Sequence, residues 1–343
     1  MVKIGNYIIS ERSPVYIIAE IGVNHNGSVE LAKKLIDRAV AAGANAVKFQ
    51  TFDPDEMVSE DADLAPYQKR CSNKKQKEML KHLALTPGQL EILKKDCDHK
   101  GITWLSTPFD IKSARFLNKL KVPAFKVGSG DLTNIPLLLE IAKFGKPILL
   151  STGMAELTDI ETALNYLNHP SDLVLLHCTS AYPAPFADLH LRVIDTLKAA
   201  FPHLVGYSDH SSGVEIPLAA TALGYKIIEK HFTLDKRMEG PDHRASLEPD
   251  EFCQMVTGIR HVEKALGTSH KLIRPSEAEL KKRVRKGIYA CKDLDKGIML
   301  TEEDLAYLRP LSEIEASQFQ CVVGRRLNRS IKKGDSLRWS DLN

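Results

Sequence analysis

Two histidines stand at the ends of apolar segments that are typical of buried strands. In "YKIIEKHFTL", residues 225–234, the apolar run stops on Glu229, Lys230 and His231, and "LVGYSDH" ends on His210. An unpaired charge buried in a strand costs several kcal/mol, so this ending indicates either a polar site or a surface loop. Two imidazoles on neighbouring strands can bind one metal ion and leave positions open for water and a substrate oxygen. The alternative is one core histidine and one loop histidine, because the chain has 12 histidines and no compact ligand motif.

Two lysines lie inside apolar segments, where lysine is rarely found. Lys48 occurs in "VKF" and Lys126 in "FKV". A buried lysine needs an anionic partner, which a neighbouring carboxylate or a bound anion can supply. Two such lysines, together with several nearby hydroxyl groups, predict a site for an anionic small molecule.

The elements that must position these side chains are short apolar runs alternating with amphipathic stretches. The helix expected at 28–43, for example, begins on a capping Ser28 and ends on Gly43. Eight strand-and-helix units in succession predict a (β/α)8 TIM barrel, an α/β fold, with a doubly wound open sheet as the alternative. The eight expected strands are 15–22, 44–51, 102–107, 122–130, 147–152, 172–179, 204–210 and 225–231.

Active sites of such barrels lie at the carboxyl ends of the strands. Polar residues do gather at these ends of the expected strands. Loops are polar in any case, which accounts for the hydroxyl groups better than for the two lysines inside strands. The polar residues at the strand ends are Glu20, Lys48, Ser106, Thr107, Lys126, Ser129, Ser151, Thr152, Thr179, Ser180, Ser208, Asp209, His210 and His231.

The C-terminal part of the chain has a different pattern. Residues 1–266 form the expected barrel, residues 267–285 are polar and predict a linker, and residues 286–343 predict a small second domain with a weak internal repeat around Gly297 and Gly334. From 267 to 343 there are 16 Lys and Arg against 11 Asp and Glu. This basic balance could help to hold an anionic substrate, although a solvated basic face is the more common explanation.

Composition narrows the class of protein. The chain has 343 residues, of which 43% are hydrophobic and 27% charged, and a formal net charge of +3. These values predict an ordinary globular protein and no nucleic-acid partner. The six cysteines are scattered without a C-x-x-C pair, which favours reduced thiols. We find no signal-peptide core and no apolar run of about 18 residues, so we expect a cytoplasmic protein with no membrane partner.

Several motifs, in order along almost the whole chain, resemble the N-acetylneuraminate (sialic acid) synthase family. The C-terminal segment is similar to that family's antifreeze-like (SAF) domain. The motifs are "AEIGVNHNGS", "AVKFQTF", "STPFD", "FKVGSGD", "LLSTGM", "HCTSAYPAPF", "GYSDHSSG" and "IEKHFTLDKRMEGPDHRASLEPDE".

The resemblance implies a condensation of phosphoenolpyruvate with the open-chain aldehyde of N-acetylmannosamine, giving N-acetylneuraminate and phosphate by C–O cleavage. It implies a divalent metal, Mn2+ first with Mg2+ or Co2+ as alternatives, bound by His210 and His231. It also implies a domain-swapped homodimer in which Arg309 contacts the sugar's N-acetyl group from the partner subunit. The other implied site residues are Glu20 as acid/base, Lys48, Lys126, Ser129, Ser151 and Ser208 for phosphoenolpyruvate, Asp242 for a sugar hydroxyl, and Asp131, Ser180 and Tyr182 for substrate.

Some assignments have simpler alternatives or depart from the family pattern. Glu20 could only pair with a barrel lysine, and Asp242 could only cap the helix that begins near Pro249. Ser180 and Asp131 stand where some members carry Asn and Glu. The turn after Arg309 lacks the glycine common in the family.

Other functions remain open at this point. Related synthases use diacetamido-trideoxy sugars, giving legionaminic or pseudaminic acid, or use N-acetylmannosamine 6-phosphate. A Schiff-base aldolase would also place a lysine in a barrel mouth. A metal-dependent hydrolase and a non-catalytic sugar-binding protein are the alternatives from other classes.

Overall fold

The computed structural model describes residues 1–65, 68–70, 75–168 and 172–343. The chain divides into two compact units, Met1–Gly267 and Thr268–Asn343, and each is described by itself. Cys71, one of the cysteines expected to be reduced, lies outside the described residues. No helix in the described part of the chain is long and apolar enough to cross a membrane.

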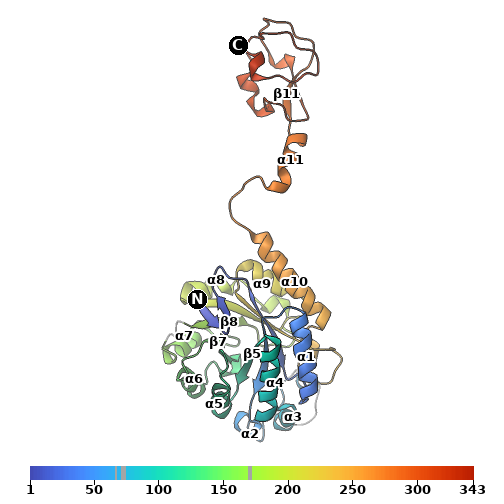
Figure 1. The fold of residues 1–343 in the computed structure, drawn as a ribbon. Coiled ribbons are helices and arrows are strands. Elements are labelled where there is room, and N and C mark those ends of the chain that lie inside the picture. Colours follow the sequence, from blue (N-terminus) through green and yellow to red (C-terminus); the bar gives the residue numbers. More distant parts are fainter. Residues whose placement is uncertain (66–67, 71–74, 169–171) are drawn as a thin grey trace. The chain divides into compact units, whose positions relative to one another are not determined.

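The first unit is a nearly closed barrel of eight parallel strands with helices around it (Figure 1), as predicted from the sequence. The hydrogen-bonded order is β5-β4-β3-β10-β9-β8-β7-β6, and the two end strands, β5 and β6, lie in contact. The strands are β3 (Tyr16–Gly22), β4 (Ala46–Thr51), β5 (Thr103–Pro108), β6 (Phe125–Val127), β7 (Ile148–Ser151), β8 (Leu173–Cys178), β9 (Leu204–Asp209) and β10 (Ile227–His231).

Helices follow the strands and cover the outside of the barrel. Ser28 caps the first of them as predicted, accepting a hydrogen bond from the Leu31 amide. The helices are α1 (Val29–Ala41), α2 (Pro54–Met57), α3 (Gln76–Leu83), α4 (Pro87–Lys100), α5 (Ile111–Lys119), α6 (Ile135–Ala142), α7 (Leu157–Tyr166), α8 (Val193–Ala200), α9 (Glu215–Leu223) and α10 (Pro249–Leu266). The 3-10 turns of this unit are η1 (Gln68–Arg70), η2 (Ser129–Asp131), η3 (Phe186–Asp188) and η4 (His243–Ala245).

The strands alternate between an outer and an inner face, and the two faces have separate cores. In β10, Ile228 packs in the large cluster between strands and helices, whereas Ile227 packs in a small cluster inside the barrel. The same division holds in β4, where Val47 faces outward and Ala46 inward. The inner face is therefore apolar at the amino ends of the strands, and the residues two and four positions later point inward at the carboxyl ends.

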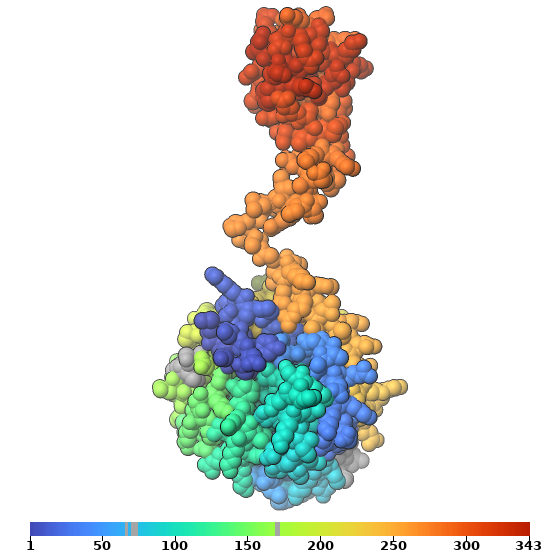
Figure 2. Space-filling view, in the orientation of Figure 1, coloured from blue at the N-terminus to red at the C-terminus, as the bar shows by residue number. Residues whose placement is uncertain are grey.

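An N-terminal hairpin closes the apolar end of the barrel. Its strands are β1 (Val2–Ile4) and β2 (Tyr7–Ile9), which pair antiparallel. Val2, Ile4 and Ile9 are buried in the same cluster as the inward-facing residues of the strands. The N-terminal segment, in dark blue, lies on the surface of this unit (Figure 2). This hairpin was not predicted from the sequence.

The second unit contains α11 (Pro275–Val284), the antiparallel strands β11 (Gly287–Ala290) and β12 (Leu305–Leu308), and the 3-10 turns η5 (Glu302–Asp304), η6 (Ala316–Cys321) and η7 (Trp339–Asp341). Helix α11 lies within the range predicted as a linker and has no buried residue. The weak repeat is visible in the structure, because Gly297 and Gly334 both have positive φ and each precedes a 3-10 turn ending on a buried aspartate.

Candidate active site

A cavity of about 310 Å³ opens at the carboxyl ends of the barrel strands. Side chains from all eight strands or the residues just after them line it, because the inner face of each strand continues from the apolar core into this space. Ten of the thirteen site residues predicted from the sequence line the cavity: Glu20, Lys48, Lys126, Ser129, Ser151, Ser180, Tyr182, Ser208, His210 and His231.

Four buried ionisable side chains form a network at the base of the cavity. Lys48 Nζ lies 2.8 Å from Glu20 Oε2 and 3.7 Å from Glu229 Oε1, and Lys126 Nζ lies 3.0 Å from the same Glu229 oxygen. None of the four side chains is more than about one-twentieth exposed. Both lysines therefore have the anionic partners that their burial requires. Glu20 does pair with a barrel lysine, and it also lines the cavity.

The two carboxyl groups of this network have different proton affinities. Burial raises the pKa of Glu20 to about 7, although the charge on Lys48 opposes the rise. Burial acts in the same direction on Glu229, but Lys126 and Lys48 outweigh it and hold the pKa of Glu229 below its usual range. Two carboxyl groups with separated pKa values allow one to carry a proton while the other stays charged. Glu20 is thus suited to exchange a proton near neutral pH.

Hydroxyl groups surround the network. Ser208 Oγ donates to Glu229 Oε1 over 3.0 Å, and Lys48 Nζ donates to Thr107 Oγ1 over 3.0 Å. Ser129 Oγ accepts the Gly153 amide hydrogen over 3.0 Å. Ser151 Oγ is buried and makes no hydrogen bond to the described residues. A buried hydroxyl without a partner costs free energy, so Ser151 is available to a polar ligand in the cavity.

His210 and His231 lie together, with their ring centroids 5.3 Å apart. His210 Nδ1 lies 2.9 Å from the Thr179 carbonyl oxygen; if Nδ1 carries the hydrogen and donates it there, Nε2 is left as a lone-pair donor. His231 Nδ1 is buried and makes no hydrogen bond to the described residues. Burial holds the pKa of His231 well below its usual range, and the charges of His210 and Lys48 add to this effect. A neutral imidazole with a free ring nitrogen is what a metal ligand requires.

These two histidines fit a divalent cation with several open positions. The described residues contain no group of three or more His, Cys, Asp or Glu side chains arranged to hold a metal ion. Asp242 Oδ2 lies 3.7 Å from His231 Nδ1. The Tyr182 ring lies over the pair, at 4.1 Å from the His210 ring centroid and 5.6 Å from that of His231.

Three predicted residues do not line the cavity. Asp131 is half-buried at the end of η2, and its Oδ1 accepts a hydrogen bond from Asn134 Nδ2 over 2.9 Å. Asp242 is buried beside His231 and does not cap α10, whose N-cap residue is Glu248. The alternative of a helix-capping Asp242 is therefore wrong. Arg309 is exposed in the second unit, in the loop after β12.

Several residues that line the cavity were not predicted from the sequence. Glu229 is the most important of them, since it bridges both lysines. Its signal was present in the sequence, because it stands two positions before His231 and must share that residue's face of the strand. Gln50 stands two positions after Lys48 and therefore shares that residue's face of the strand. Its Nε2 donates to Glu20 Oε1 over 3.2 Å. Thr107 lines the cavity as its place at a strand end predicted, whereas Phe109, Met154 and Cys178 line it without having been assigned there.

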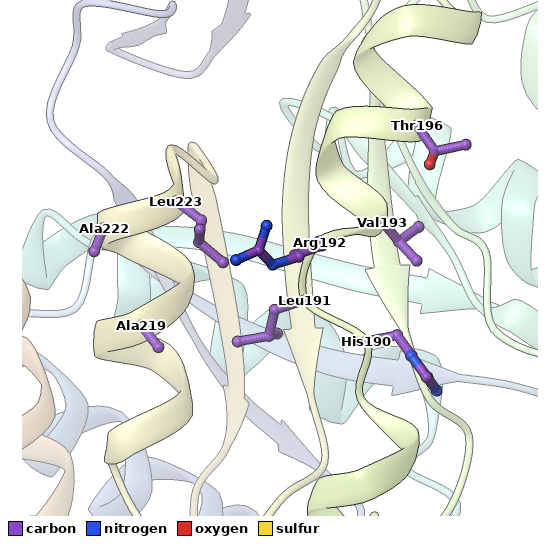
Figure 3. Close-up of a pocket in the computed structure, with 8 residues that line it drawn as sticks. All are labelled: His190, Leu191, Arg192, Val193, Thr196, Ala219, Ala222 and Leu223. Carbon is purple, nitrogen blue, oxygen red and sulfur yellow. The ribbon is translucent and has the colours of Figure 1, made fainter.

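A second hollow, of about 700 Å³, lies outside the barrel between α8 and α9. Figure 3 shows the side chains of Arg192 and Leu223 pointing into the space between these helices. Among the described residues that line it, the ionisable ones are His190 and Arg192, and both are exposed. These described residues include no buried, converging polar groups like those of the barrel cavity, so the barrel cavity is the candidate active site.

Comparison with known proteins shows the family to which the chain belongs. Residues 35–271 match the NeuB family, and residues 285–343 match the SAF domain. The chain is 45% identical over 331 residues to the N,N'-diacetyllegionaminic acid synthase of Campylobacter jejuni, which covers 94% of this chain and 98% of that protein. It is 37% identical over 300 residues to the N-acetylneuraminate-9-phosphate synthase of Homo sapiens, covering 87% of this chain and 84% of that protein.

A solved structure is also similar to this chain. The crystal structure of the N-acetylneuraminic acid (sialic acid) synthetase of Leptospira borgpetersenii, in complex with citrate, matches with a TM-score of 0.74 and 38% identity, covering 81% of this chain and 94% of that one. The resemblance seen in the sequence is confirmed. The chain belongs to the NeuB family, is an enzyme of the sialic acid synthase type, and ends in a SAF domain.

Proposed function

We propose that this enzyme condenses phosphoenolpyruvate with the open-chain aldehyde of a 2-acetamido sugar, forming a nine-carbon 2-keto acid and phosphate. One observation carries the proposal. Two buried lysines, a carboxyl group with a pKa near neutrality and two neighbouring histidines converge on one cavity at the carboxyl ends of the strands. Anion binding, proton transfer and metal binding are the three tasks that such a condensation needs.

Lys48 and Lys126 bind the carboxylate and phosphate of phosphoenolpyruvate in this proposal. Glu20 and Glu229 form ion pairs with these lysines, so the network has little net charge when both carboxyl groups are ionised. A proton on Glu20 leaves one positive charge in excess, which favours an anionic ligand. Ser129, Ser151 and Ser208 add hydroxyl groups around the same space, and the unpartnered Ser151 hydroxyl has most to gain from a ligand.

His210 and His231 would hold the divalent metal, which we propose to be Mn2+, with Mg2+ or Co2+ as alternatives. When bound there, the metal would act as a Lewis acid on the aldehyde oxygen of the acceptor. The chain's contribution is to place two imidazoles side by side, with a His231 Nδ1 that makes no hydrogen bond to the described residues. Burial keeps the pKa of His231 low for this purpose, and the Thr179 carbonyl orients His210.

Glu20 is the proposed acid/base residue. A carbon–carbon bond forms between C3 of phosphoenolpyruvate and the aldehyde carbon while protonated Glu20 gives its proton to the aldehyde oxygen, which leaves an oxocarbenium-like C2 and an ionised Glu20. Glu20 takes a proton from the water that attacks C2, and the C2–O bond to phosphate then breaks so that phosphate leaves with the bridging oxygen. A pKa of about 7 suits both halves of this role, since the group can accept and return a proton near neutral pH.

For the acceptor we propose 2,4-diacetamido-2,4,6-trideoxymannose, giving N,N'-diacetyllegionaminic acid, with N-acetylmannosamine as the second candidate. Phe109, Met154 and Tyr182 give the lining an apolar portion that suits acetamido and deoxy methyl groups. The 45% identity to the Campylobacter synthase supports the same choice. A 6-phosphate acceptor has less support, because the lysines among the described lining residues, Lys48 and Lys126, are both ion-paired at the base.

The role of the second unit is also a proposal. Arg309 is exposed there and therefore free to meet a substrate or another subunit. We propose that it contacts the acceptor's N-acetyl group across a domain-swapped homodimer, and that Asp242 binds a hydroxyl of the sugar. Asp242 is buried within 3.7 Å of His231, which supports a place near the acceptor.

Phosphate release tests the proposed function. The purified protein is incubated with phosphoenolpyruvate and Mn2+, with and without EDTA, against N-acetylmannosamine, its 6-phosphate and 2,4-diacetamido-2,4,6-trideoxymannose. We expect release with the diacetamido sugar, with or without slower release with N-acetylmannosamine, and none in EDTA. Equal release without any sugar would indicate a phosphatase and contradict the proposal.

A further inference from the structure

A buried ion pair lies on the outer face of the barrel, immediately next to both histidines. The side chains of Asp209 and Lys230 are 0% exposed, and Lys230 Nζ lies 2.5 Å from Asp209 Oδ2. The two residues are register partners in the parallel pairing of β9 with β10. This pair takes no part in the cavity, because neither residue lines it.

The pair is also bonded to the turn that follows β9. Asp209 Oδ1 accepts the Ser211 amide hydrogen over 2.9 Å, and Lys230 Nζ donates to the Ser211 carbonyl oxygen as well as to Asp209. Both carboxylate oxygens of Asp209 therefore accept hydrogen bonds, and Lys230 joins β10 to β9 and to the turn after β9. Such a closed set of charged hydrogen bonds restricts the relative movement of the two strand ends.

Strand alternation connects this pair to the site. Asp209 and Lys230 point outward, so the next residues, His210 and His231, point inward to the cavity. We propose that the Asp209–Lys230 pair is a positioning device that sets the separation of the two imidazoles and so presents both to one divalent cation. The inference rests on the proposed function, since it takes these histidines as the metal ligands.

The effects of an apolar replacement on stability and on metal affinity distinguish a positioning role of the ion pair from a purely stabilising one. Removing two charges from water is costly, and replacing a buried ion pair by apolar side chains of similar volume is often neutral or stabilising. If the pair served stability alone, an apolar replacement would be harmless. If it positions the histidines, the replacement would leave a folded protein that binds metal less well.

The test compares Mn2+ affinity with stability in the full-length, metal-free protein. The variant is Asp209→Leu/Lys230→Met, with Asp209→Asn/Lys230→Met as a second form that keeps an acceptor for the Ser211 amide. The dissociation constant for Mn2+ is measured by electron paramagnetic resonance and the unfolding midpoint by circular dichroism. We expect the affinity for Mn2+ to fall about tenfold, the magnitude typical of lost outer-shell support, without a matching loss of stability.

Leu138→Ala is the matched control, because Leu138 is buried on α6 away from both histidines. It should lower the unfolding midpoint and leave the Mn2+ affinity unchanged. Wild-type affinity in either folded double variant would overturn the inference and leave the proposed function intact. A wild-type protein that binds no Mn2+ would overturn both, so the two failures are distinguishable.

Discussion

The raised pKa of Glu20 means that its ionised form destabilises the folded protein, and Glu20→Gln should reveal this. Burial raises the pKa of Glu20 from an ordinary value of 4.5 to about 7. Between these two pH values the folded state holds a proton that the unfolded state has lost. The contribution of Glu20 to the free energy of unfolding therefore falls as pH rises from 4.5 to 7, and it does not recover above pH 7.

The magnitude follows from the two pKa values. One pKa unit corresponds to about 1.4 kcal/mol, so the full difference is about 3 kcal/mol, of which about 2–3 kcal/mol lies between pH 5 and pH 8. Glu20→Gln keeps the shape of the side chain and removes the titration. Relative to the wild type, the variant should therefore gain about 2–3 kcal/mol of stability between pH 5 and pH 8.

Urea unfolding of metal-free protein at pH 5 and pH 8 measures this difference. The chain has two tryptophans, so a Trp339→Phe background leaves the buried Trp104 as the reporter of the barrel. Glu140→Gln is the matched control. Hydrogen bonds from Arg115 and Lys143 lower the pKa of Glu140 to about 2, so its titration lies below this pH range and its effect should be the same at both values. Parallel pH profiles for the wild type and Glu20→Gln would refute the reasoning.

Three further results are expected. His231→Ala should abolish Mn2+ binding, measured by electron paramagnetic resonance, with an unchanged circular dichroism spectrum; full activity in this variant would remove the metal-ligand assignment. Met154 lines the cavity, is 75% exposed and has a positive φ of 58°. Met154→Gly should therefore relieve backbone strain and raise the free energy of unfolding by up to about 1 kcal/mol, and yet raise KM for the acceptor. An unchanged KM would show that Met154 does not contact the sugar. Mixing Glu20→Ala with Arg309→Ala chains under subunit exchange should restore some activity, and verified hybrids without activity would contradict a second unit acting across the dimer.

The sequence predicted the barrel well because its signals are local. Eight apolar runs separated by amphipathic stretches specify strands and helices in order, and the carboxyl-end rule then places polar residues at one mouth. His210 and His231 were expected on neighbouring strands, and the structure pairs those strands and brings the rings to a centroid distance of 5.3 Å. The N-terminal hairpin was missed because two three-residue strands carry little periodicity.

The charge network was harder to predict. Glu229 could have been assigned to the inner face from its spacing to His231, but its partner Lys126 is 103 residues away in the sequence. No local pattern states which lysine a carboxylate will meet across a barrel. The separated pKa values of Glu20 and Glu229 arise from that three-dimensional arrangement, because both lysines contact Glu229 and only Lys48 contacts Glu20.

The fate of the bridging oxygen of phosphoenolpyruvate tests the central claim most directly. The substrate is labelled with 18O between C2 and phosphorus and incubated with the enzyme, Mn2+ and the diacetamido acceptor, and the released phosphate is analysed by mass spectrometry. Attack of water on C2, assisted by Glu20, predicts that the label leaves with phosphate. Unlabelled phosphate, with 18O retained in the organic product, would mean P–O cleavage and would contradict the condensation mechanism.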